Sequence, residues 1–562
     1  MSKAADQIIA GDALLRSLKL NGVDKLFMNP GSDFAPIIES YASSERDNFP
    51  DPIMAMHEHV VVTMAHGYYL ATGQMQAAAV HVNVGLANAS MALINAHSDD
   101  VPIFMMSGRN PLTEGAREGS RHTPIQYGQE MFDQTGIVRE TVKWDYELRY
   151  GDTISALVDR GCAIARQEPA GAVYLSLPRE PLCEMADKPI LSSQSVPTKP
   201  YPDPEAIKTL ADEIAQAKNP LIICSRGDTE GQVGALITQI AQENTIAVSE
   251  VFVTRNLLAT DFNFNIGGQI ATHLPLADLV LVVDAPVAWI ASKAKPADGA
   301  KIIHLGPDPL FGRIPVRGYE ATTHIQCDTV AGLEALNATL PSKVNEERAS
   351  KIHQKHLAFR SKIQDKVEAC EGDVLNKPFV AKCVSDIIGD GVIFAERAGP
   401  LALYNVKGPN HWFGNTQAGG LGWALPAALG FQLADKDRLV ACIVGDGSYV
   451  FANPIACHQA AEAQGLPLLT IILDNGSYDA VRISTLDIYP SGKAAKANHV
   501  PMVPFAPNPD YAAIAEAAGC AVFHVSSADS LRGTLVNALG IIKNDKKQVL
   551  INIKVGMDDG EK

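Results

Sequence analysis

"LVACIVGDGSYVF", residues 439–451, is an apolar run that ends in an acidic side chain between two glycines. A short run of apolar, β-branched residues that stops at Gly or Asp is typical of a parallel strand whose carboxyl end meets a ligand-side loop. The Asp446 carboxylate has two interpretations. It is either a turn residue in contact with solvent, or a group held at the strand end to bind a ligand.

A second strand and turn follow one helix further along the chain. Residues 453–465, with Pro454 in the first turn, predict that helix. The run LPLLTIILDNGS at 466–477 then predicts a buried strand that ends near Asn475. Two adjacent parallel strands joined by one helix place the residues after their carboxyl ends side by side, so we expect Asp446 next to Asn475.

The two turns together supply a set of oxygen ligands. The Asp446 carboxylate, the Asn475 amide oxygen and the Ser477 backbone carbonyl form half a shell of the kind that Mg²⁺ completes with phosphate or water oxygens. The flanking glycines would let a diphosphate approach the backbone closely. Turn chemistry explains either motif alone, whereas the pair favours a metal site.

Apolar runs alternate with helical patterns along most of the 562 residues, which predicts an α/β protein with three parallel-sheet domains. We expect an N-terminal domain over 1–190, a central Rossmann-like domain over 191–340, a connecting segment over 341–376 and a C-terminal domain over 377–562. The Ser- and Pro-rich stretch 191–206 is a predicted linker. No GxGxxG follows a strand of the central block, so a dinucleotide is not predicted there.

The charge balance and the cysteines narrow the class of protein. A formal net charge of −16 argues against nucleic-acid binding, which relies on Lys and Arg to neutralise phosphates. No apolar run reaches the length of a membrane span, so no membrane partner is expected. The nine cysteines form no CxxC pair, and their odd number is typical of free thiols in a reducing compartment. We therefore predict a cytoplasmic protein.

With these motifs the sequence resembles the thiamine-diphosphate enzymes related to acetolactate synthase, benzoylformate decarboxylase and benzaldehyde lyase, whose signature is GDG followed by an Asn-containing turn. The resemblance implies thiamine diphosphate and Mg²⁺ as cofactors. It also implies that the C-terminal domain binds the diphosphate and the N-terminal domain binds the aminopyrimidine. Asp446, Asn475 and the Ser477 carbonyl are the implied metal ligands. The implied cofactor-binding residues of the same loops are Gly445, Asp446, Gly447, Ser448, Asn475 and Ser477.

The segment AGGLGWALPAALGFQLA at 418–434 extends the resemblance upstream. By resemblance, Leu421 is the apolar residue that wedges the cofactor into its bent form, and Gly419 makes a backbone contact to the aminopyrimidine. A packing helix opened by a glycine turn is the alternative, and it would be preferred without Asp446 nearby.

The same family implies a catalytic Glu between a strand end and a helix that closes with GYxxxTG. The sequence MHEHVVVTMAHGYYLATG at 56–73 places Glu58 there. By resemblance, this carboxylic acid shares a proton with the aminopyrimidine N1′, so that the ring can remove the proton from the thiazolium C2. Apolar surroundings would raise the pKa of such a Glu and favour the shared proton. Alone, a Glu at a helix start would more often be a partner of the helix dipole.

The two halves of this site also imply an assembly. Glu58 and Asp446 serve opposite ends of one cofactor but lie in different predicted domains. In the resembling family those domains come from two subunits. We therefore expect a homodimer as the minimum and a homotetramer as the complete assembly.

At the substrate end of the site, some residues resemble a decarboxylase and others resemble carboligases. LFMNPGSDFAPI at 26–37 resembles the corresponding turn of benzoylformate decarboxylase, which implies that Ser32 meets the substrate carboxylate. His81 stands where that enzyme has a proton-relay His, although a satisfied His at a strand end is an equal alternative. Gln129, followed by Lys143, instead resembles the carboligases acetolactate synthase and benzaldehyde lyase, unless Gln129 simply caps a helix.

One departure weakens the likeness to the decarboxylase. The second active-site His of that enzyme should follow VVDAPV, but this sequence has Ala291 there. His57, His59, His122 or His411 could replace it, and spacing selects none of them. The Arg-rich turn of flavin-binding acetolactate synthases is not recognisable either, so we do not expect FAD.

We therefore predict a Mg²⁺- and thiamine-diphosphate-dependent enzyme that decarboxylates a 2-oxo acid to a C2-bound enamine, as benzoylformate decarboxylase does. An acetolactate-synthase-like carboligase, or a benzoin-type acyloin lyase without FAD, is the alternative within enzymes. A catalytically silent homologue is the alternative outside them. The expected partners are small molecules, namely a 2-oxo acid, an aldehyde or an acyloin. Pocket volume decides among these, and the sequence leaves it open.

Overall fold

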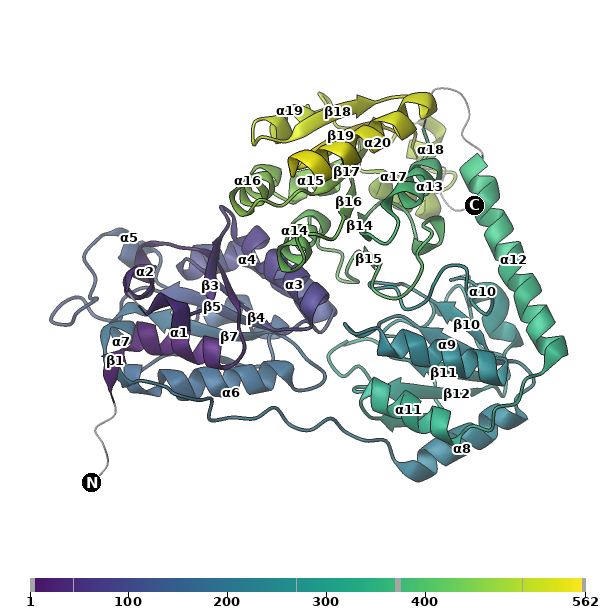
Figure 1. Ribbon diagram of the computed structural model, residues 1–562, viewed down its shortest axis with the longest axis horizontal. Helices are drawn as coiled ribbons and strands as arrows, with labels where there is room; N and C mark the ends of the chain where they lie inside the picture. The colour runs from purple at the N-terminus through teal and green to yellow at the C-terminus, as the bar shows by residue number, and fades with distance from the viewer. Residues whose placement is uncertain (1–5, 44, 269, 369–374, 498, 558–562) are drawn as a thin grey trace.

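Three parallel β-sheets flanked by helices build the computed structural model of this chain (Figure 1). The structure describes residues 6–43, 45–268, 270–368, 375–497 and 499–557. In Figure 1 the N-terminal sheet lies at the left, the central sheet at the lower right and the C-terminal sheet at the top. The predicted α/β architecture with several parallel-sheet domains is confirmed.

The N-terminal sheet has the strand order β3-β2-β4-β5-β7-β6, and its pairings are parallel. Its strands are β2 (Lys25–Asn29), β3 (Asp51–Met54), β4 (Gln76–Val80), β5 (Ile103–Arg109), β6 (Asp145–Glu147) and β7 (Val173–Pro178). Its helices are α1 (Ala10–Leu20), α2 (Ala35–Ala42), α3 (Glu58–Thr72), α4 (Val82–Ser98), α5 (Ile125–Gly128), α6 (Ile154–Arg166) and α7 (Arg179–Cys183). A short antiparallel ribbon pairs β1 (Gln7–Ile9) with β8 (Met185–Asp187).

The C-terminal sheet repeats this topology with the order β15-β14-β16-β17-β19-β18. When the six strands of each sheet are numbered in chain order, both sheets have the order 2-1-3-4-6-5. The strands are β14 (Val392–Glu396), β15 (Trp412–Gly414), β16 (Val440–Gly445), β17 (Leu469–Asp474), β18 (Ala521–Val525) and β19 (Val549–Lys554). The helices are α13 (Lys377–Ile388), α14 (Ala424–Ala434), α15 (Asp446–Phe451), α16 (Pro454–Gln464), α17 (Asp479–Ile488), α18 (Lys493–Ala497), α19 (Tyr511–Glu516) and α20 (Ala528–Asp545).

The central sheet has five parallel strands in the order β10-β9-β11-β12-β13. They are β9 (Pro220–Cys224), β10 (Ala247–Glu250), β11 (Leu279–Val283), β12 (Lys301–Gly306) and β13 (Thr323–Gln326), with helices α8 (Pro204–Gln216), α9 (Gln232–Asn244), α10 (Ile270–His273) and α11 (Thr329–Thr339). Helix α12 (Glu346–Glu368) then runs along the right edge of Figure 1 toward the C-terminal sheet. Residues 369–374 of the expected connecting segment lie outside the described ranges.

Helices α3 and α14 join the N- and C-terminal domains. All of α14 except Ala434 is buried, as expected for a helix whose sequence is apolar on every side. At the crossing, a Cβ added to Gly67 would lie 1.9 Å from the Ala427 carbonyl oxygen, and a Cβ on Gly430 would lie 1.9 Å from that of Met64. Because these contacts are reciprocal, the two helices cross backbone to backbone about a local two-fold axis.

Among the described residues, the free thiols of Cys162, Cys224, Cys327, Cys442, Cys457 and Cys520 are buried, and that of Cys183 is half-buried. Within the described ranges, the helices include none that combines the length and the apolar character needed to cross a membrane.

Candidate active site

The C-terminal sheet brings the two predicted metal-binding turns together. Strands β16 and β17 are parallel neighbours, so Asp446 and Asn475 begin adjacent turns at one edge of the sheet. Asp446 Oδ1 accepts a hydrogen bond from the Gly447 N–H at 2.7 Å. Asp446 Oδ2 accepts from the N–H groups of Asn475, at 3.1 Å, and Gly476, at 2.7 Å.

The donor set of these turns fits Mg²⁺. Burial raises the pKa of Asp446, and the N–H groups around it partly offset that effect, so a cation at the carboxylate would stabilise its ionised form. The described residues contain no cluster of three or more His, Cys, Asp or Glu side chains that could hold a metal ion. A metal here would therefore also use the Asn475 amide and the Ser477 carbonyl, and such oxygens are the ligands that Mg²⁺ prefers.

The other predicted residues of the first turn surround Asp446. Gly445 ends β16, and α15 begins at once with Asp446, whereas the sequence indicated only a turn before the next helix. A Cβ on Gly447 would lie 3.0 Å from the Tyr478 ring, which shows how closely the loop packs against the turn after β17. Ser448 is buried in α15.

A buried carboxylate that no motif singled out holds the loop of Gly419 and Leu421. Glu396, the last residue of β14, accepts hydrogen bonds from the N–H groups of Gly422, at 2.7 Å, and Ala424, at 2.8 Å. Gly422 has φ +83°, and a Cβ there would lie 2.4 Å from a backbone nitrogen, so this position requires glycine. Glu396 thus holds the loop through backbone N–H groups. On the same loop, Leu421 is half-buried and Gly419 is exposed.

Asn95 of α4 reaches the same loop from the N-terminal domain. Its Nδ2 donates to the Gly420 carbonyl at 3.0 Å. Its Oδ1 accepts from the Gly420 N–H at 3.1 Å and from the Thr416 hydroxyl at 2.8 Å. A lone Asn inside a helix gives no sequence pattern from which this role could be read.

Glu58 begins α3, and two amide side chains hold its carboxylate. Oε1 accepts from Asn29 Nδ2 and Oε2 from Asn88 Nδ2, each at 3.0 Å. These residues lie at the edge of the N-terminal sheet where β2, β3 and β4 end. Among the described residues, no hydrogen bond or ion pair joins Glu58 to Asp446.

His81 is paired with Asp33, which the sequence patterns did not identify. His81 Nδ1 lies 2.6 Å from Asp33 Oδ1, and Asp33 Oδ2 accepts from the Val82 N–H at 3.1 Å. The hydrogen bond to Asp33 raises the pKa of His81, against the opposing effect of burial. Glycines make room for the pair, because a Cβ on Gly31 would overlap the His81 ring and a Cβ on Gly108 would overlap the Asp33 carboxylate.

Gln129 and Ser32 lie beside this pair. Gln129 Nε2 is 3.4 Å from His81 Nε2, so the decarboxylase-like and carboligase-like residues share one site. The exposed Ser32 has its carbonyl 3.5 Å from an Arg179 nitrogen. The other terminal nitrogen of Arg179 lies 3.1 Å from His122 Nδ1.

The histidines that could replace the one missing at Ala291 differ in their contacts. His59 is buried, its Nε2 lies 3.0 Å from a backbone carbonyl, and burial lowers its pKa. His57 caps α3, and the His411 ring contacts backbone carbonyls of its own loop. Of the four, His122 is the one that Arg179 links to Ser32.

Both ends of the chain match one class of enzyme. Residues 9–137 match the family described as "Thiamine pyrophosphate enzyme, N-terminal TPP binding domain", and residues 398–553 match "Thiamine pyrophosphate enzyme, C-terminal TPP binding domain". Thiamine pyrophosphate is thiamine diphosphate under its other name. The chain belongs to the thiamine-diphosphate-dependent enzymes, and the predictions of this family and of thiamine diphosphate as its cofactor are confirmed.

Relatives within this class include decarboxylases and acetolactate synthases. Benzoylformate decarboxylase of Pseudomonas aeruginosa is 26% identical over 93% of this chain and 95% of the relative. The acetolactate synthase large subunit of Haemophilus influenzae is 23% identical over 99% and 95%. Mg²⁺ is the usual partner metal of the cofactor in this family.

Solved structures share the fold over nearly the full length. The thiamine diphosphate-dependent 4-hydroxybenzoylformate decarboxylase of Rhodococcus jostii aligns with a TM-score of 0.78 at 22% identity, covering 98% of this chain and 100% of that one. Benzoylformate decarboxylase of Polynucleobacter necessarius aligns with a TM-score of 0.80 at 19% identity, covering 98% and 99%. These structures share the fold, and the two matched domains together with the sequence relatives make the protein an enzyme of the decarboxylase and acetolactate-synthase-like family.

Proposed function

We propose that this enzyme decarboxylates a 2-oxo acid in the manner of benzoylformate decarboxylase. The observation that carries the proposal is the His81–Asp33 pair beside the exposed Ser32 turn. A His whose protonated form is stabilised by a carboxylate can deliver a proton to a carbon that has lost CO₂. The nearby hydroxyl can hold the substrate carboxylate before it leaves.

The cofactor residues divide between the two outer domains. Asp446, Asn475 and the Ser477 carbonyl would hold Mg²⁺ and the diphosphate. Glu58 and the loop 419–421 would hold the aminopyrimidine end of the cofactor. When bound, thiamine diphosphate supplies the electron sink for the electron pair that the departing carboxylate leaves behind.

The protein's own groups hold and move protons at defined atoms. Asn29 and Asn88 each donate to one Glu58 oxygen, so the carboxyl is oriented whichever oxygen carries the shared proton. Asp33 engages His81 Nδ1, which leaves Nε2 as the atom that gives or takes a proton. His122, positioned by Arg179, is the candidate for the second proton carrier absent at Ala291.

A carboligase or acyloin lyase is the second candidate, because Gln129 stands 3.4 Å from His81 Nε2. An amide at this point can bind the oxygen of a second carbonyl compound and hold it against the reacting carbon. Addition of that carbonyl would then compete with protonation.

We propose a homodimer as the minimum assembly and a homotetramer as the complete one. Apolar side chains stand exposed in the single chain next to both halves of the site, and a second copy would cover them. Those near Glu58 are Met54, Met56 and Val84, and those after Asp446 are Val450, Phe451 and Ile455.

The domain divisions at 190, 340 and 376 and the cytoplasmic location are also proposals. The three separate sheets support the divisions. The free, mostly buried thiols support a reducing compartment.

A substrate panel tests the function. Pyruvate, benzoylformate and a guanidino 2-oxo acid are incubated with and without thiamine diphosphate, together with benzoin for the reverse reaction. The guanidino acid is included because a 24% identical relative is a probable 2-ketoarginine decarboxylase of Pseudomonas aeruginosa. Cofactor-dependent release of CO₂ with aldehyde as the main product supports the proposal. Acyloin as the main product, or cleavage of benzoin alone, supports the second candidate.

A further inference from the structure

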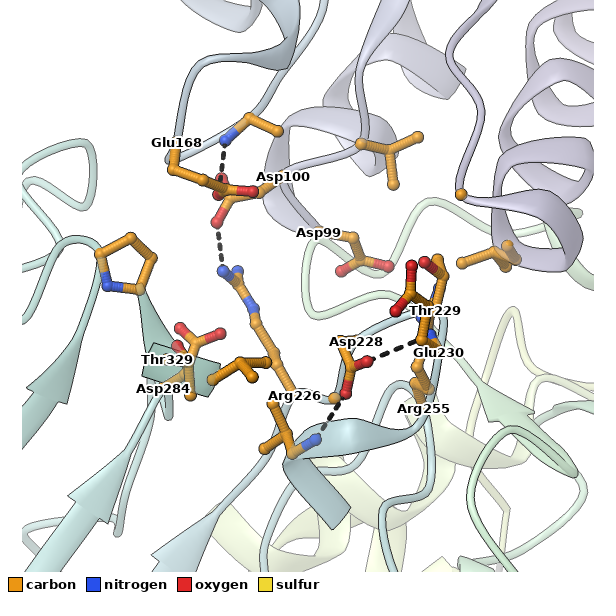
Figure 2. Close-up of a pocket in the computed structure, with 18 of the residues that line it drawn as sticks. Asp99, Asp100, Glu168, Arg226, Asp228, Thr229, Glu230, Arg255, Asp284 and Thr329 are labelled. Atoms are coloured by element: carbon orange, nitrogen blue, oxygen red, sulfur yellow. Dashed lines mark hydrogen bonds and ion pairs between the residues drawn. The ribbon is translucent and has the colours of Figure 1, made fainter. Parts of the chain in front are cut away.

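An acidic cavity of about 320 Å³ lies between the N-terminal domain and the carboxyl ends of the central strands (Figure 2). None of its walls comes from the turns around Glu58, His81 or Asp446. Acidic side chains outnumber basic ones by seven to three. The acids are Asp99, Asp100, Glu168, Asp228, Glu230, Asp284 and Asp328, and the bases are Lys199, Arg226 and Arg255.

Part of this charge is neutralised within the cavity wall. Arg226 pairs with Asp100, and Lys199 pairs with Asp328 at 3.0 Å. Asp228 accepts hydrogen bonds from three N–H groups at the start of α9. A nucleotide phosphate would normally use such a helix start in a Rossmann-like domain. Here a carboxylate occupies it, and the surplus of acids would repel a phosphate.

Among the described residues, two cavity-lining side chains, Arg255 and Asp99, have polar atoms that make no hydrogen bond. Arg255 is only 6% exposed, and its guanidinium lies over the Phe413 ring without a hydrogen bond or ion pair among the described residues. Asp99 Oδ1 is buried without a partner. Burial raises the pKa of Asp99 to about 7 and that of Asp284 to about 6, although the nearby Arg226 guanidinium lowers both values.

Arg255 and Asp284 lie toward opposite ends of the cavity (Figure 2). Arg255 has Asp228 and Asp99 among its charged neighbours, whereas Asp284 has the Arg226–Asp100 pair and Glu168. A ligand that fills the cavity would thus meet a cation next to an acid at one end and further acids at the other. Free buried charges are costly, so each end favours a ligand group of opposite charge.

We propose that this cavity binds a basic amino acid, with its carboxylate on Arg255, its α-ammonium on Asp99 and its side-chain cation on Asp284 and Glu168. The net positive charge of such a molecule balances the surplus of acids, which a nucleotide cannot do. This site is separate from the proposed catalytic function and does not depend on it.

The cavity is also connected to the candidate cofactor loop. Ser98, the residue before Asp99, accepts a hydrogen bond through its hydroxyl from the Ala418 N–H at 3.1 Å. Ala418 directly precedes the loop 419–421, which Asn95 of α4 also holds. An α-ammonium bound to Asp99 would therefore act next to the contact that fixes the start of the segment proposed to bind the aminopyrimidine.

Calorimetric titration of the holoenzyme tests the ligand class with L-arginine, L-lysine, agmatine and ADP as probes. We expect one L-arginine or L-lysine per chain, agmatine at least about tenfold weaker because it lacks the carboxylate for Arg255, and no binding of ADP at this site. ADP binding that competes with L-arginine, equal affinity for agmatine, or no binding of either amino acid would overturn the proposal.

A matched pair of variants places the ligand in this cavity. Asp284 has φ +40°, a conformation that Asn tolerates, so Asp284→Asn removes the charge and keeps the backbone. It should weaken L-arginine binding by about tenfold or more. Glu320→Gln removes an exposed charge of the same domain and should leave binding unchanged. Equal affinity in Asp284→Asn and Glu320→Gln would contradict the assignment.

Discussion

At the scale of single residues, the two carboxylates proposed for the ends of the cofactor are held by different kinds of donor. Glu58 is held by two side-chain amides, and Asp446 by backbone N–H groups. Amide side chains can adjust as a carboxyl gains or loses a proton, whereas backbone donors favour the ionised form of a fixed carboxylate. This difference agrees with a proton-sharing role for Glu58 and a metal-binding role for Asp446.

Glu58→Gln should lower turnover by about 10²–10⁴-fold, because an amide cannot share a proton with the aminopyrimidine. Gln keeps the shape of the side chain, so thiamine diphosphate should still bind. Steady-state kinetics and a cofactor titration separate the two effects. The exposed Glu39→Gln is the control. Full activity in Glu58→Gln would refute this mechanism.

Asp446→Ala should weaken cofactor binding most when Mg²⁺ is scarce, by about 10–100-fold, since it removes a metal ligand. Thiamine diphosphate affinity measured across a series of Mg²⁺ concentrations checks this result. The exposed Asp437→Ala, on the same domain, should match the wild type. An Asp446→Ala affinity equal to that of the control at low Mg²⁺ would exclude the metal role.

Asp33→Asn should lower the pKa of His81. The hydrogen bond to Asp33 raises that pKa in the folded protein, so the pair stabilises the fold below the unfolded His value. That stabilisation is lost as the pH rises through the raised folded value. NMR titration of labelled His ring carbons should show the His81 midpoint moving to lower pH. A midpoint that does not move would show that Asp33 does not control His81.

At the scale of elements, the long buried strands could be predicted and the short ones could not. Apolar runs revealed β16 and β17, and hence the meeting of Asp446 with Asn475. The edge strands β3, β6 and β15 are only three or four residues long and gave no comparable pattern. The strand order that the N- and C-terminal sheets share could not be predicted from the sequence for another reason. Topology depends on which positions are buried, and two domains can share it without sharing residues.

Gly430→Ala should destabilise the protein by about 1–3 kcal/mol, because the added Cβ meets the Met64 carbonyl at the α3–α14 crossing. Gly540→Ala is the matched control, since a Cβ on that residue of α20 meets nothing within 4 Å. It should stabilise by about 0.5–1 kcal/mol through helix propensity. Thermal unfolding of both variants checks the pair. A Gly430→Ala melting temperature at or above that of the wild type would contradict the close crossing.

At the scale of the whole molecule, residues near one another in sequence were predicted and residues joined only by the fold were missed. Glu58, Asp446 and Asn475 sit in local motifs. Asp33 and Glu396 bind partners that lie far away in the sequence, so no pattern in their own segments predicted those contacts. The roles proposed for all these residues stay predictions until variants are measured.

In the whole assembly, we expect Glu58 of one chain and Asp446 of another to serve the same cofactor. Glu58→Gln and Asp446→Ala chains with different affinity tags can be co-expressed, and hybrid assemblies purified through both tags. Each hybrid dimer then holds one site with both residues intact and one site with neither. At scarce Mg²⁺ and limiting thiamine diphosphate, turnover of the hybrid should return to about half of the wild-type rate per dimer, although each variant alone has little activity under these conditions. Hybrids as inactive as their parents would show that both residues act within one chain.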